Sequence, residues 1–253
     1  MGILARTMRN AALAAAAAVM TAGTGLAQES FRVGSTPSGV PFTFLDVKTN
    51  EIDGVMVDII KAVGEAEDFT PQVEATQWSA LIPSLTGDKI DIIAAAMYAT
   101  EERAKVVAFT DTVYSYGEGL FVPKDDQTDY KSLDDLAGKT VGAQVGTAYV
   151  EPLKASGKLK EVKVYDTIAD IMRDVSLGRI DAGFGDRPIV AYQLAQGAAD
   201  VRLAPNYESQ ITGNVALAVR PADTELLGRL NAGLKKVKES GKLDELIAKW
   251  GIE

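Results

Sequence analysis

Short apolar runs alternate with longer amphipathic segments along most of the chain. Residues 31–35 (FRVGS) predict a strand, and residues 54–66 (GVMVDIIKAVGEA) predict a helix because apolar residues recur there at helical spacing. Residues 89–96 (KIDIIAAA) predict a strand buried on both faces, since their apolar positions are continuous rather than alternating. Such alternation is typical of parallel sheets that are covered by helices.

The same order of elements recurs in the second half of the chain. Residues 132–135 (SLDD) match a capping box, and Thr167 is placed to cap a helix that ends at Gly178. The other predicted elements are strands at residues 71–76, 139–144, 162–166 and 179–185, helices at residues 79–85 and 147–156, and two helices at the C-terminus.

Two segments of the chain also resemble each other. SLTGDKIDI (84–92) and SLGRIDA (176–182) both run from a helix end through a glycine into a strand. This repetition favours two similar α/β lobes, with the extended residues 114–123 and 213–221 crossing between them.

The first 27 residues are typical of a secretory signal peptide. A short basic start with Arg6 and Arg9 precedes an apolar middle (residues 11–19) and small residues at GLA (25–27). A transmembrane helix is disfavoured, because the run is too short to span a bilayer of about 30 Å. We expect cleavage between Ala27 and Gln28, and no cysteine follows that could carry a lipid anchor.

Composition disfavours several function classes. The net charge is −9, and residues 1–27 hold two arginines and no acidic residue, so the remainder carries −11 and would repel nucleic acid. The chain has no cysteine and no histidine. Disulfides, a thiolate nucleophile, an imidazole base and the usual zinc ligands are therefore missing. We expect no metal and no cofactor, and an enzyme is less favoured, although carboxylates and lysines could still catalyse.

Seven segments carry a characteristic order and spacing: VGSTPSGVPFTF (33–44), GVMVDIIKAV (54–63), WSALIPSLTGDKIDII (78–93), ATEERAKVVAFTDTVY (99–114), GKTVGAQVGTAYV (138–150), GRIDAGFGDRP (178–188) and GKLDELIAKWG (241–251). Together they resemble the polar amino-acid type of bacterial extracellular solute-binding proteins, the receptors of ABC importers. The resemblance runs from about Phe31 to the C-terminus.

The resemblance implies an α/β, bilobed periplasmic-binding-protein fold of type II, in which two α/β lobes joined by a two-segment hinge close on one small ligand. We expect lobe 1 to comprise residues 28–118 and 216–253, and lobe 2 to comprise residues 119–215. The resemblance also implies a periplasmic location and an ABC permease in the inner membrane as partner. We expect the protein to be a monomer.

Arg103, Gly146 and Thr147 match the family's carboxylate-binding positions. The resemblance implies that Arg103 grips the ligand's carboxylate, which suits the planar fork of a guanidinium. It implies that the backbone N–H of Thr147 meets the same carboxylate, while Gly146 lets the backbone approach closely. From spacing alone, Arg103 could instead be a surface residue paired with Glu101 or Glu102, and Thr147 could be only a helix cap.

Asp186 matches the carboxylate that receives the ligand's ammonium group. It lies just beyond the predicted strand 179–185, where open α/β sheets bind ligands. The alternative is an N-cap of the helix that begins at Arg187 and Pro188. Both roles can coexist, because a carboxylate has several acceptor sites.

Phe42, Trp78 and Tyr98 occupy positions that line the pocket in this family, although Phe42 could instead belong to the core. Tyr98 and Ala96 depart from the family pattern, because members that bind ordinary amino acids usually carry small hydroxyl residues there. Three aromatic faces suggest a cage for a delocalised or alkylated cation, each face contributing about 0.5–2 kcal/mol. This pattern looks more like members that bind compact zwitterions such as ectoine.

Thr36 is a second departure. Relatives that bind lysine, arginine or histidine have an acid at this position, and a hydroxyl cannot neutralise a cationic side chain. A basic amino acid is therefore disfavoured, unless Glu118 or another nearby acid substitutes.

The resemblance implies a periplasmic receptor that captures a small zwitterion, such as a polar amino acid or a derivative, and delivers it to a permease. An ectoine-like or betaine-like compatible solute is an alternative ligand. A periplasmic dehydratase or lyase of the same fold is an alternative of another class, in which Asp186 or Glu118 could be the acid-base group. A sensory domain of a larger receptor is a third interpretation, less favoured because of the secretory signal.

Overall fold

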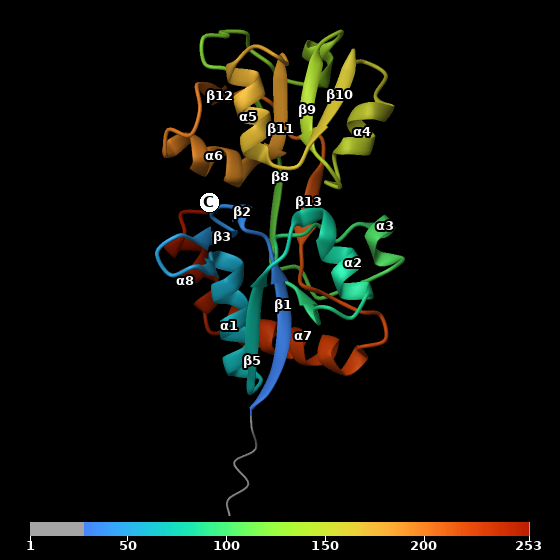
Figure 1. Ribbon diagram of the computed structural model, residues 1–253, viewed down its shortest axis with the longest axis vertical. Helices are drawn as coiled ribbons and strands as arrows, with labels where there is room; N and C mark the ends of the chain where they lie inside the picture. Colours follow the sequence, from blue (N-terminus) through green and yellow to red (C-terminus); the bar gives the residue numbers. More distant parts are fainter. Residues whose placement is uncertain (1–27, 253) are drawn as a thin grey trace, which may run out of the picture.

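Two lobes, each built on a β-sheet, lie one above the other along the long axis of the molecule (Figure 1). The computed structural model describes residues 28–252, so the predicted signal peptide lies outside the described residues. Within this range, no helix has both the length and the apolar character of a membrane span.

The lower lobe in Figure 1 is built on a five-stranded sheet of order β5-β1-β6-β14-β7. Strand β1 runs parallel to β5 and β6, whereas β14 is antiparallel to β6 and β7. A small antiparallel sheet, β2-β3-β4, adjoins it. The strands are β1 (Glu29–Ser35), β2 (Ser38–Gly39), β3 (Thr43–Asp46), β4 (Glu51–Asp53), β5 (Phe69–Ala75), β6 (Ile92–Ile93), β7 (Ala108–Phe109) and β14 (Ala218–Val219).

Helices cover this sheet with their apolar faces. The predicted first helix is confirmed as α1, which buries Val55, Ile59 and Val63 along one face and contacts α7 and α8. The short helix predicted near residues 79–85 is also present, as η1 followed by α2. The helices of this lobe are α1 (Val55–Ala66), η1 (Trp78–Ala80), α2 (Leu81–Thr86), α3 (Glu101–Ala104), α7 (Thr224–Glu239) and α8 (Lys242–Lys249).

The upper lobe is built on a sheet of order β10-β9-β11-β8-β12. Strand β9 is parallel to both β10 and β11, as predicted. Thr167 caps α5 by accepting a hydrogen bond from the N–H of Asp170, and Ser132 opens η2 with the predicted capping box. The elements are η2 (Leu133–Leu136), β9 (Thr140–Gln144), α4 (Val150–Ala155), β10 (Glu161–Tyr165), α5 (Ile168–Ser176), β11 (Ala182–Asp186), α6 (Arg187–Ala195) and β12 (Val201–Leu203).

Two antiparallel strands, β8 (Tyr114–Pro123) and β13 (Thr212–Val215), cross between the lobes. Residues 114–117 of β8 pair with β13, and residues 118–123 pair with β11 and β12. The second crossing segment is thus shorter than the predicted 213–221, because β14 already belongs to the lower sheet. The two predicted lobe boundaries, after residues 118 and 215, both fall at this strand pair. The division of the chain into lobes at these residues remains a prediction.

Glu118 fixes the point at which β8 enters the upper lobe. Its carboxylate is 1% exposed and accepts hydrogen bonds from the Tyr207 hydroxyl (3.1 Å) and the N–H groups of Gln210 (2.7 Å) and Ile211 (2.9 Å). Burial raises the pKa of this carboxyl, and the backbone donors act in the opposite direction. Its carboxylate is therefore engaged in holding the 207–211 loop against β8, which disfavours a role for Glu118 at the ligand.

Two predicted elements are shorter than expected. Within the run 89–96, Ile90 and residues 92–96 are buried, but only Ile92 and Ile93 pair as a strand, and Ala96 has left-handed backbone (φ 53°). The apolar residues of this segment reflect burial in the lobe, and not hydrogen-bonded pairing along a long strand. The helix predicted from residue 147 begins at Val150, because the chain first turns at Gly146 (φ 73°).

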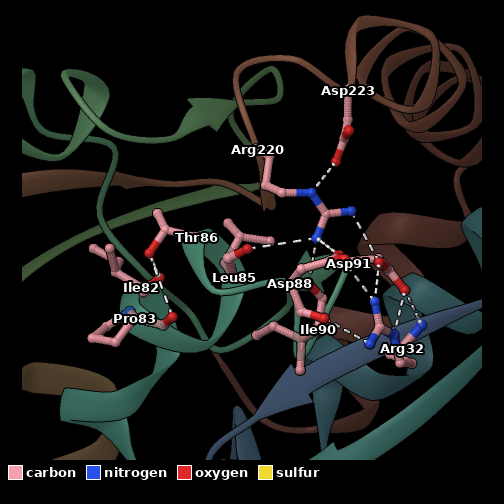
Figure 2. Close-up of polar contacts among 10 residues, drawn as sticks. All are labelled: Arg32, Ile82, Pro83, Leu85, Thr86, Asp88, Ile90, Asp91, Arg220 and Asp223. Atoms are coloured by element: carbon pink, nitrogen blue, oxygen red, sulfur yellow. Dashed lines mark hydrogen bonds and ion pairs between the residues drawn. The ribbon is translucent and has the colours of Figure 1, made fainter.

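A network of charged side chains ties together three strands of the lower sheet (Figure 2). Arg32 of β1 donates to both carboxylate oxygens of Asp91 (2.9 and 2.8 Å), which precedes β6. Arg220, which follows β14, donates to the same carboxylate at 2.9 Å and pairs with Asp223 at 2.8 Å. The hydrogen bonds from Arg32 hold the pKa of Asp91 well below its usual range, against the opposing effect of burial.

We expect Asp91→Asn to lower the free energy of unfolding by about 2 kcal/mol at pH 7, because two guanidinium groups lose a charged acceptor. The folded-state pKa is lowered, so the stabilisation is complete above pH of about 4 and is lost as the pH falls towards that pKa. Urea denaturation at pH 7 and pH 3 should therefore show a smaller difference from wild type at pH 3. The control is Asp88→Asn, since Asp88 contacts the same arginines but its side chain is 76% exposed. Equal losses in the two variants would contradict this prediction.

Candidate functional site

The predicted site residues follow the carboxyl ends of strands in both sheets. Trp78 follows β5 and Ala96 follows β6 in the lower lobe. Thr147 follows β9, and Asp186 ends β11 in the upper lobe. Carboxyl ends of parallel strands are where open α/β sheets place their ligands, and here the two sets face each other across the junction of the lobes.

Two small cavities, of about 20 and 10 Å³, lie at this junction. Three residues line both, namely Trp78, Ala96 and Asp186, so the cavities adjoin. Each has room for about one water molecule, so the lobes are closed and must separate before a ligand enters. The larger cavity is otherwise lined by Thr36, Ser38, Gly39, Phe42, Thr43, Ala95, Gln144, Ile168 and Ile189, and the smaller one by Tyr98, Arg103, Thr147, Ala148 and Tyr149.

Arg103 reaches from the lower lobe to the upper one. It lies in α3, whose N-cap Thr100 accepts the N–H of Arg103 at 3.3 Å. Its Nη1 donates to the carbonyl oxygen of Tyr98 at 2.7 Å, and its Nη2 donates to that of Gly146 at 2.9 Å. The guanidinium carbon also lies 5.4 Å from the ring centre of Trp78. Arg103 is therefore a residue of the lobe junction, and burial lowers its pKa.

The alternative interpretation of Arg103 as half of a surface ion pair does not hold. Glu102 pairs with Lys105 instead, and among the residues that the structure describes no ion pair joins Arg103 to Glu101 or Glu102.

Asp186 ends β11 and precedes α6, but its side chain makes no capping hydrogen bond. The N-cap interpretation therefore accounts for its position and not for its carboxylate. Burial raises its pKa to about 7, while the positive charge of Arg103 acts in the opposite direction. Within residues 28–252, no ion pair joins Asp186 to Arg103, although both line the smaller cavity. The site thus holds two half-buried groups of opposite charge that are not joined by an ion pair.

Thr147 lies in the turn between β9 and α4 and does not cap that helix. Its hydroxyl donates to the carbonyl oxygen of Gln144 at 2.7 Å, and its N–H makes a longer contact of 3.3 Å with the same oxygen. Gly146 is adjacent, and its contribution to the junction is the carbonyl oxygen that Arg103 contacts.

The three predicted aromatic residues are distributed between the two cavities. Phe42 lines the larger one, is 2% exposed and stacks on Tyr116 with ring centres 5.2 Å apart. Tyr98 lines the smaller one and donates its hydroxyl to the carbonyl oxygen of Tyr116 at 3.0 Å. Its ring lies against Gly213 of β13, where a Cβ would clash. Trp78 lines both cavities, so no single cavity of the described residues is enclosed by all three rings.

Sequence reasoning missed two tyrosines of this site. Tyr116 sits in β8 between Phe42 and Tyr98 and donates its hydroxyl to the carbonyl oxygen of Ala96 at 3.2 Å. Tyr149 lines the smaller cavity. Its position two residues after Thr147, in a turn already assigned to the ligand, was the available signal. The sequence contains no comparable signal for Tyr116, because an aromatic residue within a predicted strand usually belongs to the core.

Comparisons with known proteins identify the family and the fold. Residues 31–253 match the family model for bacterial extracellular solute-binding proteins, family 3. The chain is 33% identical to the putative ABC transporter arginine-binding protein 2 of Escherichia coli (strain K12), covering 88% of this chain and 91% of that protein.

Two solved structures have similar folds. A mutant of ArgBP from T. maritima superimposes with a TM-score of 0.80 at 33% identity, covering 88% of this chain and 96% of that one. The ancestral amino acid-binding protein AncCDT-1, a precursor of cyclohexadienyl dehydratase, has a TM-score of 0.79 at 30% identity, covering 89% and 96%. The expected family and bilobed α/β fold are thereby confirmed. The chain belongs to the bacterial extracellular solute-binding proteins, family 3.

Proposed function

We propose that this protein is the periplasmic receptor of an ABC importer, and that its ligand is a small zwitterion whose side chain carries no positive charge. The observation that supports this most directly is the pair of half-buried, unjoined charges at the lobe junction. Arg103 could bind a carboxylate with two N–H groups, and Asp186 could accept an ammonium group, within one small site. An α-amino acid or a similar zwitterion carries both partners.

Binding requires opening and closing of the lobes. With the lobes apart, the carboxylate would replace the Tyr98 and Gly146 carbonyl oxygens as an acceptor for Arg103. Closure would then bring Asp186 and Thr147 onto the ligand from the upper lobe. The hinge we propose is the β8–β13 pair, and the ligand stabilises the closed state because only that state contacts it from both sides. The permease would receive the closed, loaded protein.

The lining of the larger cavity favours an uncharged side chain. Its polar groups include Thr36, whose hydroxyl lies 2.6 Å from that of Thr43, and Gln144. Asp186 is its single lining acid, and the ligand's ammonium group needs that carboxylate. The E. coli relative is named for arginine, and a cationic side chain here would lack a second acid. Glutamine-like ligands therefore fit better than arginine.

An ectoine-like zwitterion is a second candidate. Phe42 and Trp78 both line the larger cavity and could contact an alkylated cation with their ring faces. A dehydratase would need an acid-base group at the ligand, and Glu118 is instead bonded to the 207–211 loop. Asp186 is then the single carboxylate left for such a role among the described residues that line the two cavities. We therefore propose binding without chemistry.

A thermal-shift panel tests the ligand class. We expect one neutral zwitterion, from glutamine and other polar amino acids, betaines and ectoine, to stabilise the protein by about 4 kcal/mol at a thousandfold excess over Kd. Arginine and lysine should shift Tm less. Strong stabilisation by arginine would contradict the neutral side chain, and turnover of a cyclic hydroxy acid would contradict the receptor function.

Arg103→Ala should weaken binding of the panel's best ligand by about 2–5 kcal/mol, because a desolvated carboxylate would lose its charged partner. Calorimetric titration measures the change. The control is Arg173→Ala, which removes an arginine whose side chain is 62% exposed and which pairs with Asp170 in α5. Equal affinities of Arg103→Ala and wild type would remove Arg103 from the site.

The affinity should also rise with pH through neutrality. Asp186 must be ionised to pair with an ammonium group, and its raised pKa of about 7 means that below this value binding has to release a proton. We expect Kd to fall by up to about tenfold per pH unit between pH 5 and 7, and to level off above 7. Arg103, Tyr116, Tyr98 and Tyr149 face Asp186, and none of them changes charge in this range. Glu118 pairs with Asp186 in strand register and also has a raised pKa, so a slope that survives in Asp186→Asn would belong to Glu118.

The control for the pH series is Asp186→Asn, which should bind more weakly and show no such slope. For the unliganded protein the sign is opposite: a raised carboxyl pKa makes the folded state less stable as the pH rises from about 4 to 7. A wild-type Kd that is constant from pH 5 to 8 would show that Asp186 does not pair with the ligand's cation.

A further inference from the structure

The hydroxyl of Tyr149 is buried and has no hydrogen-bond partner. The residue is 1% exposed, and it lines the smaller cavity together with Arg103, Thr147 and Asp186. A buried hydroxyl without a partner destabilises a folded protein, so such groups are rare and usually have a function.

The other buried tyrosines of residues 28–252 all have partners. The hydroxyls of Tyr98 and Tyr116 donate to backbone carbonyl oxygens, Tyr130 donates to Asp126 at 2.8 Å and Tyr207 donates to Glu118. The neighbouring Thr147 hydroxyl lies near enough to lower the pKa of Tyr149, but its hydrogen bond goes to the carbonyl oxygen of Gln144 at 2.7 Å. Tyr149 therefore differs from four buried residues of the same type in the same protein.

We propose that Tyr149 is a ligand-contacting residue, whose hydroxyl donates a hydrogen bond to the ligand carboxylate beside Arg103. The inference rests on the proposed function, since it assigns a further contact within that site. It would give the carboxylate one partner from each lobe: Arg103 of α3 below, and Tyr149 from the turn before α4 above.

Two features suit Tyr149 to this role. Its ring belongs to the apolar cluster of the upper lobe, with Val150 and Leu153, so the position of the hydroxyl is fixed before the ligand arrives. Burial, together with the negative charge of Asp186, raises its pKa well above the usual value. The phenol is therefore neutral and keeps its proton, as a donor to a carboxylate must.

The contact also implies selectivity for the closed state. A hydroxyl on the upper lobe can reach a carboxylate held by the lower lobe only after closure. Its hydrogen bond would thus add to the differential affinity that favours closure. A ligand whose carboxylate is replaced by an amide would lose much of this gain.

The test compares Tyr149→Phe with Tyr130→Phe, since both wild-type residues are 1% exposed and belong to the same cluster. The probes are L-glutamine, L-arginine and ectoine, together with the carboxamide of whichever the wild type binds best. We expect Tyr149→Phe to weaken binding of the carboxylate probe about 10- to 100-fold and to change binding of the carboxamide little. Tyr130→Phe should leave both affinities unchanged.

The unliganded proteins give a second readout that needs no ligand. Removing an unpartnered hydroxyl should leave Tm unchanged or raise it, whereas Tyr130→Phe should lower Tm because Asp126 loses a donor. Wild-type affinity in Tyr149→Phe overturns the inference, as does a fall in its Tm equal to that of Tyr130→Phe. If the wild type binds no probe, the proposed ligand class fails, and the Tm comparison still decides whether the hydroxyl has a structural partner.

Discussion

Two half-buried charges held apart, Arg103 and Asp186, are the constraint on which the lobe junction depends. The guanidinium is held by the Tyr98 carbonyl oxygen and the Trp78 ring of its own lobe and by the Gly146 carbonyl oxygen of the other, and the carboxylate is held by its place at the end of β11. The cost of burying Asp186 without a direct partner is visible in its raised pKa. The two sheets are oriented so that their carboxyl ends bring these groups to one place, and a zwitterion is the chemical species that would satisfy both.

This arrangement links closure to ligand binding. In the closed protein Arg103 contacts the carbonyl oxygen of Gly146, a neutral acceptor that is weaker than a carboxylate. Asp186 is meanwhile partly shielded from water and gains no ion-pair partner among the described residues. Closure without a ligand is therefore costly, and a ligand's ammonium and carboxylate groups offset that cost only when the lobes meet. The same reasoning explains why the unpartnered hydroxyl of Tyr149 is tolerated, since its partner would arrive with the ligand.

Much of the fold could be predicted from the sequence, because helix faces and capping residues act locally. Val55 lies on the buried face of α1, as the helical spacing of apolar residues predicted, and Thr167 caps α5, as its position predicted. The failures involve tertiary contacts. Residues 92–96 are apolar because they are buried, yet only two of them, Ile92 and Ile93, find a strand partner. Glu118 is an acid near the site in sequence, yet its acceptors are used by a loop about ninety residues away.

The crossing strands connect the hinge to the site through shared residues. Within β8, Tyr116 contacts Phe42 and Tyr98 and bonds to the Ala96 carbonyl, so it belongs to the lower part of the site. Two residues later, Glu118 pairs in register with Asp186 of β11 and belongs to the upper lobe. Only one residue of β8, Gly117, therefore separates the part that contacts the lower lobe from the part that pairs with the upper sheet. Gly117 itself pairs with β13. Any bending of β8 at this point would move Asp186 relative to Ala96, so the motion that opens the lobes would also take the site apart.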